Sequence, residues 1–159
     1  MISIGDKLPT DGLKTMGANG PEDVDFAAMT AGKKVVIFSL PGAFTPTCSA
    51  KHLPGFVEHA DAIKAKGVDE ICCLAVNDAF VMDAWAKMQG ADGKVTMLAD
   101  GSGAFTKQLG LELDLVAAGL GMRGQRFALI AEDGVVTHLA VEEAGDFSVS
   151  SAEAIIAKL

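Results

Sequence analysis

The residues with the clearest chemical potential surround Cys48, in the stretch S-L-P-G-A-F-T-P-T-C-S-A-K-H at 39–52. Thr45 is a favourable N-cap residue and Pro46 suits the first position of a helix. The pattern therefore predicts a helix that begins here, with Cys48 in its first turn. Amides of a first turn lack helical partners and the helix dipole is positive there, which favours the nucleophilic thiolate. We expect Cys48 to be a reactive thiol.

The loop before this helix carries Pro41 and Gly42. Proline has no N–H group, so it ends strand pairing and stiffens the chain. We expect the loop to lie over the sulfur and to shield it from water and from bulky electrophiles. The alternative, from the helix start alone, is that Cys48 is a small buried residue with no chemical role.

The segments that must position this cysteine alternate between apolar runs and helical patterns. Strands are expected at 35–40, 68–76, 95–98, 127–131 and 135–141, with an Asp133-Gly134 hairpin turn. Helices are expected at 46–66 with a kink at Pro54, at 79–88, at 102–109 and at 154–159. This order predicts one α/β domain over residues 1–159, with a central mixed β-sheet flanked by helices.

Other stretches give weaker patterns. Residues 1–33 are turn-rich and read as irregular structure with at most a short hairpin, and the glycine-rich residues 110–125 read mainly as loop. Residues 150–153 form a capping box before the last helix. One apolar stripe of the 79–88 helix is expected to face the core; it consists of Phe80, Val81, Ala84, Trp85 and Met88.

Composition narrows the functional classes. The chain has 159 residues, a formal net charge of −8 and a pI near 4.7. Such an acidic domain is poorly suited to phosphate backbones or anionic lipid, so we expect neither nucleic acid nor a membrane as partner. The first residues lack the basic flank and apolar core of a signal peptide, so a cytoplasmic location is expected.

The three cysteines do not form a disulfide framework. Cys72 and Cys73 are adjacent, so on a strand they point to opposite faces, and the total is odd. Both are expected to fill the core, with Cys73 as a possible second redox residue. There is no C-x-x-C and no zinc-ligand spacing, so no metal or other cofactor is expected.

Taken whole, the motif around Cys48 resembles a known family. P-x-x-x-T-x-x-C after a buried strand, here Pro41, Thr45 and Cys48, is the signature of peroxiredoxins. The wider stretch P-G-A-F-T-P-T-C-S-x-x-H-L-P-G-F is similar to the type II/type five members. Further similar runs are V-N-D-A-F-V-M at 76–82, L-A-D-G-S at 98–102, L-E-L-D-L at 111–115 and R-F-A at 126–128.

The resemblance implies a thioredoxin-like fold and a thiol peroxidase activity on hydrogen peroxide and alkyl hydroperoxides. Cys48 would attack a peroxide oxygen and become a sulfenic acid, and Thr45 would hydrogen-bond the thiolate and the peroxide. Arg126 would steady the thiolate and the charge on the departing oxygen. From the residues alone, Arg126 could also be an ordinary strand-end arginine, and Arg123 is a weaker rival for the role.

Four residues are expected to bind the substrate: Gly42, Phe44, Thr47 and His52. His52 lies four residues after Cys48, on the same helical face, where it could pair with the thiolate or shape the pocket. His59 and His138 have no motif around them and are read as surface residues.

A sulfenic acid must be reduced before the next turnover. The loop at 145–150, where some family members carry a resolving cysteine, has serines and no thiol. The resemblance therefore implies an outside reductant, either glutaredoxin with glutathione or thioredoxin. It also implies a homodimer.

Two other functions compete with the peroxidase. A redox sensor would use the same reactive cysteine but would not need the full set of Pro41, Thr45, Cys48 and Arg126. A thioredoxin-type disulfide exchanger would need the C-x-x-C that is absent. The G-x-G-x-x-G string at 119–124 is rejected as a dinucleotide site because a strand is expected after it rather than before it.

Overall fold

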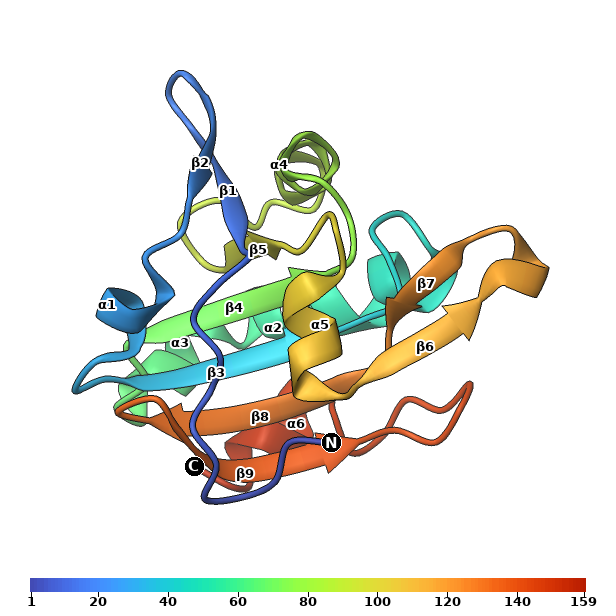
Figure 1. Cartoon of the computed structure of the whole chain (residues 1–159). Coiled ribbons are helices and arrows are strands. Elements are labelled where there is room, and N and C mark those ends of the chain that lie inside the picture. The colour runs from blue at the N-terminus through green and yellow to red at the C-terminus, as the bar shows by residue number, and fades with distance from the viewer.

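The computed structural model describes residues 1–159, and a seven-stranded mixed sheet runs through its centre (Figure 1). The strands of the chain are β1 (Lys14–Gly17), β2 (Gly20–Asp23), β3 (Lys34–Ser39), β4 (Glu70–Ala75), β5 (Thr96–Ala99), β6 (Glu112–Leu115), β7 (Gly121–Gly124), β8 (Phe127–Glu132) and β9 (Val135–Val141). The helical segments are α1 (Phe26–Thr30), η1 (Cys48–His52), α2 (Leu53–Glu58), α3 (Ala60–Ala65), α4 (Ala79–Met88), α5 (Ala104–Leu109), η2 (Val116–Ala118) and α6 (Ala152–Ile156).

The order of strands in the central sheet is β2-β1-β5-β4-β3-β8-β9. β3 pairs in parallel with β4, and β4 with β5, whereas β8 is antiparallel to β3 and β9 is antiparallel to β8. This confirms the predicted mixed sheet. β3 is central and fully covered, so its carboxyl end, which leads to Cys48, is held from both sides.

Side chains of β3 alternate between two cores, as a pleated strand requires. Val36 and Phe38 join a core formed with η1, α2, α3, α4 and α6, while Val35 and Ile37 join a second core with α1, α5 and the N-terminal segment. Cys73 lies in the first core and Cys72 in the second. The prediction that the adjacent cysteines face opposite ways is confirmed.

The chain is helical over residues 46–65 except at 59, close to the predicted 46–66, but it does not form a single regular helix. A π-helical turn, η1, is followed by α2 and α3, which separate at His59. Pro54 lies at the start of α2, directly after the π-helical turn η1, so the irregularity of this helical stretch precedes the proline.

Two stretches that were predicted to be irregular contain regular secondary structure. Residues 1–33 include the β1–β2 hairpin, which was expected at most as a short one, and also α1, whose N-cap Asp25 accepts from the Ala28 amide. Residues 110–125 are not mainly loop, because β6 and β7 form a two-stranded hairpin around η2. Glycines end these short elements and hide the periodicity. This hairpin projects from the main sheet (Figure 1).

The other helices differ from expectation in detail. α4 has the predicted bounds, but Phe80 and Met88 of the expected core stripe are 65% and 74% exposed, whereas Trp85 is buried. The last helix begins at Ala152, earlier than predicted, and its cap is Ser151, which accepts from the Ala154 amide. None of the helices combines the length and apolar character needed to cross a membrane.

The core beneath Cys48 gives a stability prediction. Phe56 is fully buried and stacks on Phe38, with ring centroids 4.0 Å apart. Phe56→Ala is expected to lower the free energy of unfolding by about 3–5 kcal/mol because it opens a cavity between β3 and α2. Urea unfolding followed by fluorescence of the single tryptophan measures this. Ile4→Ala, at a 63% exposed position, is the control and should cost less than about 0.5 kcal/mol. Equal losses would contradict the assignment.

Candidate active site

Cys48 lies in the first turn of a helix, as predicted. The Ser49 amide donates to the Thr45 carbonyl at 3.0 Å, which places the helix start at Thr45. The Thr47 and Cys48 amides donate to no backbone carbonyl, so positive amide hydrogens are left near the sulfur. The cysteine itself is fully buried.

The helix widens directly after the cysteine. The Leu53 amide donates to the carbonyl of Cys48, the five-residue spacing of a π-helix. Such turns are rare and occur often at functional sites. The prediction that Cys48 and His52 share one helical face assumed the spacing of a regular α-helix. Because the turn is wider here, the role of His52 must be judged from its contacts.

The loop over the cysteine is held by two hydrogen bonds. The Thr45 hydroxyl donates to the Gly42 carbonyl at 2.7 Å, so its proton is not directed at the sulfur. The Ala43 amide donates to Asn77 Oδ1 at 2.9 Å, which ties the loop to the segment after β4. Asn77 was noted in the sequence only as part of a similar run, without a role.

Arg126 immediately precedes β8 and reaches the cysteine. Its Nη2 donates to Cys48 Sγ at 3.2 Å, across 78 residues of sequence. It is therefore not an ordinary strand-end arginine in water. Arg123, the rival, instead donates to the carbonyls of Pro41 and Leu120 at 3.2 and 2.8 Å. A side chain at Gly42 would lie too close to the Arg123 guanidinium in its present position, so that arginine would have to move.

His52 holds the other end of the Arg126 guanidinium. Arg126 Nη1 donates to His52 Nδ1 at 2.8 Å, and His52 Nε2 lies 2.9 Å from the Ser150 carbonyl. The network assigns the ring hydrogen to Nε2, because Nδ1 must accept. Burial, and then the charge of Arg126, lower the pKa of His52 to about 3. His52 is thus neutral and does not pair with a thiolate as a cation.

Aromatic rings surround His52 on its remaining sides. Its ring centroid lies 5.0 Å from that of Phe38, 5.7 Å from that of Phe56 and 5.1 Å from that of Phe147. The Phe147 ring also lies under the Arg126 guanidinium, 5.8 Å away, within the range of a cation–π contact. These contacts fix the imidazole that orients Arg126.

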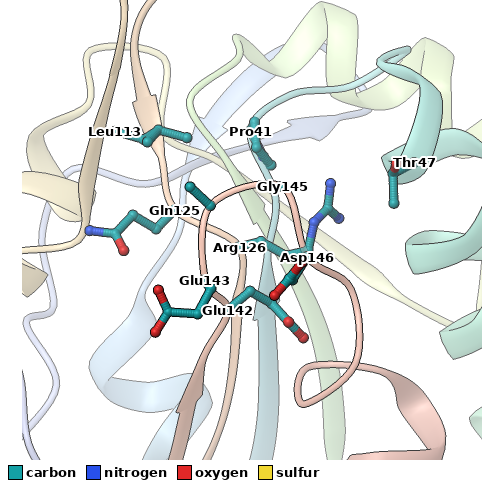
Figure 2. A pocket seen from close by; sticks show the side chains of 10 residues that line it. Pro41, Thr47, Leu113, Gln125, Arg126, Glu142, Glu143, Gly145 and Asp146 are labelled. Atoms are coloured by element: carbon teal, nitrogen blue, oxygen red, sulfur yellow. The ribbon is translucent and has the colours of Figure 1, made fainter.

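A pocket of about 150 Å³ opens beside Arg126 (Figure 2). Its walls come from Pro41, Thr47, Leu113, Gln125, Arg126 and the residues 142–146. Because Arg126 both lines the pocket and touches Cys48 Sγ, it connects the pocket to the sulfur. The acidic segment 142–146 was not singled out in the sequence, where it reads as a solvated turn after a strand.

Not all the residues expected to bind substrate meet at this pocket. Thr47 lines it, but Gly42, Phe44 and His52 do not. Phe44 is half exposed, contacts Trp85 at a centroid distance of 6.4 Å, and has a φ of 66°. This left-handed conformation is strained for a bulky residue.

The other two thiols are buried and unreactive in this conformation. Burial raises the pKa of Cys73 well above its ordinary value, and the nearby Cys48 and Cys72 raise it further. Burial, then the charge of Glu70, raise the pKa of Cys72. Both therefore stay protonated. His59 pairs with Glu153 at 3.2 Å, and His138 is partly buried; neither lines the pocket.

The family model described as Redoxin matches residues 3–156. Peroxiredoxin-2C from Oryza sativa subsp. japonica is 50% identical over 159 residues, which cover 99% of this chain and 98% of the relative. This chain belongs to the peroxiredoxins, in their type II group. The crystal structure of reduced Prx3 from Vibrio vulnificus in complex with H₂O₂ has the same thioredoxin-like fold, with a TM-score of 0.95 and 51% identity over 99% of each chain.

A second similar structure carries a different description. A protein from Burkholderia cenocepacia, described as a putative thioredoxin reductase, has a TM-score of 0.97 and is 51% identical over 100% of this chain and 98% of that chain. This chain has no C-x-x-C, and its three cysteines are free and buried. Its full-length similarity to named peroxiredoxins decides the activity: it is a thiol-dependent peroxidase, with peroxides as substrates and a thiol as reductant.

The lowered pKa of His52 predicts a pH dependence of stability. In the unfolded peroxiredoxin this group binds a proton near pH 6.5, whereas in the folded state it does so only near pH 3. Its contribution to stability is therefore complete above pH 6.5 and is lost as the pH falls toward 3. The loss can reach about 1.4 kcal/mol per pH unit.

Urea unfolding between pH 7 and 4 measures this effect. The wild type should lose more stability on acidification than His52→Asn, whereas His59→Asn, at a ring 30% exposed, should follow the wild type. Nitrogen NMR of the ring should also show Nε2 protonated and Nδ1 unprotonated at pH 5. A ring that titrates near pH 6.5 in the folded protein would refute the assignment.

Proposed function

We propose that Cys48 is the peroxidatic cysteine of this peroxiredoxin, acting on hydrogen peroxide and alkyl hydroperoxides. Its thiolate attacks one peroxide oxygen, so an S–O bond forms while the O–O bond breaks. The departing oxygen takes a proton and leaves as water or an alcohol, and the cysteine becomes a sulfenic acid. The sulfur is oxidised by two electrons, which the peroxide receives.

The observation that carries this proposal is the 3.2 Å contact between Arg126 Nη2 and Cys48 Sγ. A guanidinium keeps its charge throughout the working pH range, and its planar donors can serve both the sulfur and the departing oxygen. Charge stabilisation that is in place before the reaction requires no reorganisation during it. Arg126 is therefore assigned to thiolate and transition-state stabilisation.

Thr45 and Pro41 are assigned to the peroxide and the shape of its pocket. Because the Thr45 proton is engaged by the Gly42 carbonyl, the hydroxyl oxygen is free to accept a hydrogen bond from the peroxide O–H. Pro41 lines the pocket and Thr47 stands at its rim. Gly42 serves by leaving space for Arg123, which braces the Pro41 carbonyl.

We assign reduction of the sulfenic acid to an external thiol, either glutaredoxin with glutathione or thioredoxin. The first thiol would form a mixed disulfide with Cys48 and release water, and a second thiol would free Cys48 by exchange. Supporting this, the loop at 145–150 carries no cysteine. Cys73 is fully buried on β4 and protonated, so it would need its strand or the Cys48 helix to move.

Homodimerisation and a cytoplasmic location complete the proposal. Phe80 and Met88 are exposed apolar side chains on α4, and the half-exposed Phe44 packs on Trp85 of the same helix. Burial of such a surface between two copies would be favourable. Three free thiols suit a reducing compartment. A monomer by sedimentation velocity in wild type, or a sole location outside the cytoplasm by fractionation, would refute these parts.

Mass spectrometry after one equivalent of peroxide tests the chemical assignment. Wild type, Cys72→Ser and Cys73→Ser should carry a sulfenic acid at residue 48, trapped by a 1,3-dione, because neither strand thiol takes part. Cys48→Ser should remain unoxidised. A 48–73 disulfide in wild type would show that reduction begins inside the chain and that the external route is wrong for the first step.

Steady-state turnover tests the reductant. Peroxide consumption should continue over many turnovers when glutathione with glutaredoxin, or the thioredoxin system, is supplied, and should stop after one equivalent without a thiol. Cys48→Ser should show no consumption in any condition. A single turnover followed by arrest with every reductant would favour a peroxide sensor instead of a recycling enzyme.

A further inference from the structure

A continuous series of hydrogen bonds leads from the cysteine to the loop after β9. Arg126 Nη2 donates to Cys48 Sγ, and Arg126 Nη1 donates to His52 Nδ1. His52 Nε2 then donates to the carbonyl of Ser150. The position of that carbonyl therefore bears on the site, although Ser150 lies 102 residues beyond Cys48 in the sequence.

The carboxylate of Glu142 holds this loop in place. Glu142 Oε1 accepts from the amides of Ser148 and Ser150, both at 2.7 Å, and from the Ser150 hydroxyl at 3.0 Å. The residue is only 8% exposed and takes part in no salt bridge. A buried carboxylate without a cation is costly unless several donors satisfy it, and here all of these donors belong to one short loop.

The charge state of this carboxylate follows from the same contacts. Burial acts to raise the pKa of Glu142, but the donors at Ser148 and Ser150 outweigh it and place the pKa below its ordinary value. Glu142 is therefore ionised at neutral pH. Its backbone is also tied to the arginine directly, because the Glu142 amide donates to the Arg126 carbonyl at 2.9 Å.

We propose that Glu142 is a positioning residue for the peroxidase reaction: by fixing the Ser150 carbonyl it sets the His52 tautomer that orients Arg126 toward Cys48. With Nε2–H bonded to Ser150, His52 Nδ1 must accept, and only an acceptor can face the arginine, which has donors alone. Without that carbonyl, the Nδ1–H tautomer would direct a donor at another donor. Arg126 would then lose its orienting partner.

The loop held by Glu142 brings a second contact to the same arginine. Phe147 lies between Ser148 and the pocket residues 145–146, and its ring packs against His52 and under Arg126. Loss of the hydrogen bonds to the Glu142 carboxylate would free the Ser150 carbonyl and the Phe147 ring together. The expected defect is therefore in the orientation of Arg126 rather than in the cysteine itself.

The test is the rate of Cys48 oxidation by hydrogen peroxide in single-turnover stopped flow. Trp85 is a suitable reporter because its Nε1 donates to the hydroxyl of Ser49, next to the cysteine. Glu142→Ala is expected to slow oxidation at least about tenfold, the equivalent of one hydrogen bond. Glu142→Gln, which keeps an acceptor oxygen, should restore part of the rate. Glu58→Ala, at an exposed carboxylate on α2 that does not line the pocket, should keep the wild-type rate.

A double-mutant cycle separates positioning from a general structural effect. Arg126→Lys alone should slow oxidation by about 10²–10³. If Glu142 acts through Arg126, Glu142→Ala should add little further loss in that background, whereas independent effects would multiply. The His52 ring should also lose its uniform Nε2–H signature in nitrogen NMR of Glu142→Ala. If Glu142→Ala does not fold, Glu142→Gln replaces it in the double-mutant cycle and in the NMR measurement. The expected losses of oxidation rate and of the Nε2–H signature are then smaller.

The outcomes distinguish this inference from the proposed function on which it rests. A wild-type oxidation rate in Arg126→Lys would refute the assigned role of Arg126. A slow Arg126→Lys together with a folded Glu142 variant of wild-type rate and tautomer would refute only the role of Glu142. Multiplicative losses in the cycle would reduce Glu142 to a structural residue of the loop.

Discussion

The site depends on one interaction, the hydrogen bond from Arg126 to the sulfur of Cys48. A thiol in the apolar core would remain protonated, because burial disfavours the anion, as it does for Cys73. What differs at Cys48 is a guanidinium 3.2 Å away and a helix start with unpaired amides. The two cysteines of this core therefore differ in which charged and polar groups reach the sulfur.

The arginine must itself be held in place, and a neutral histidine does so. A charged His52 would repel Arg126 and could not accept its hydrogen bond. The hydrogen bond therefore depends on the burial that lowers the pKa of the imidazole. The surrounding aromatic rings keep water out, and the Ser150 carbonyl selects the tautomer. The chemistry of the sulfur is therefore shared among the segment before β8, the η1 turn and the loop before α6.

Local patterns in the sequence were sufficient for much of this arrangement. The buried strand before Pro41, the helix start at Thr45 and the opposite faces of Cys72 and Cys73 all follow from residue type and period. Sequence patterns did not predict helix irregularities that no proline marks, namely the π-helical turn and the separation of α2 from α3 at His59. They also failed in the β6–β7 hairpin, where glycines end elements too short to show a period.

By itself, the sequence determined that Cys48 lies at a helix start, the order of most strands and helices, and the family to which the motif belongs. Only the tertiary structure decided that Arg126 rather than Arg123 reaches the sulfur, that His52 is neutral and serves the arginine, and that Glu142 anchors the loop above them. The reason is physical. Helix starts and strand faces are set by neighbours a few residues away, whereas hydrogen bonds across 78 and 98 residues exist only once the sheet has brought their partners together.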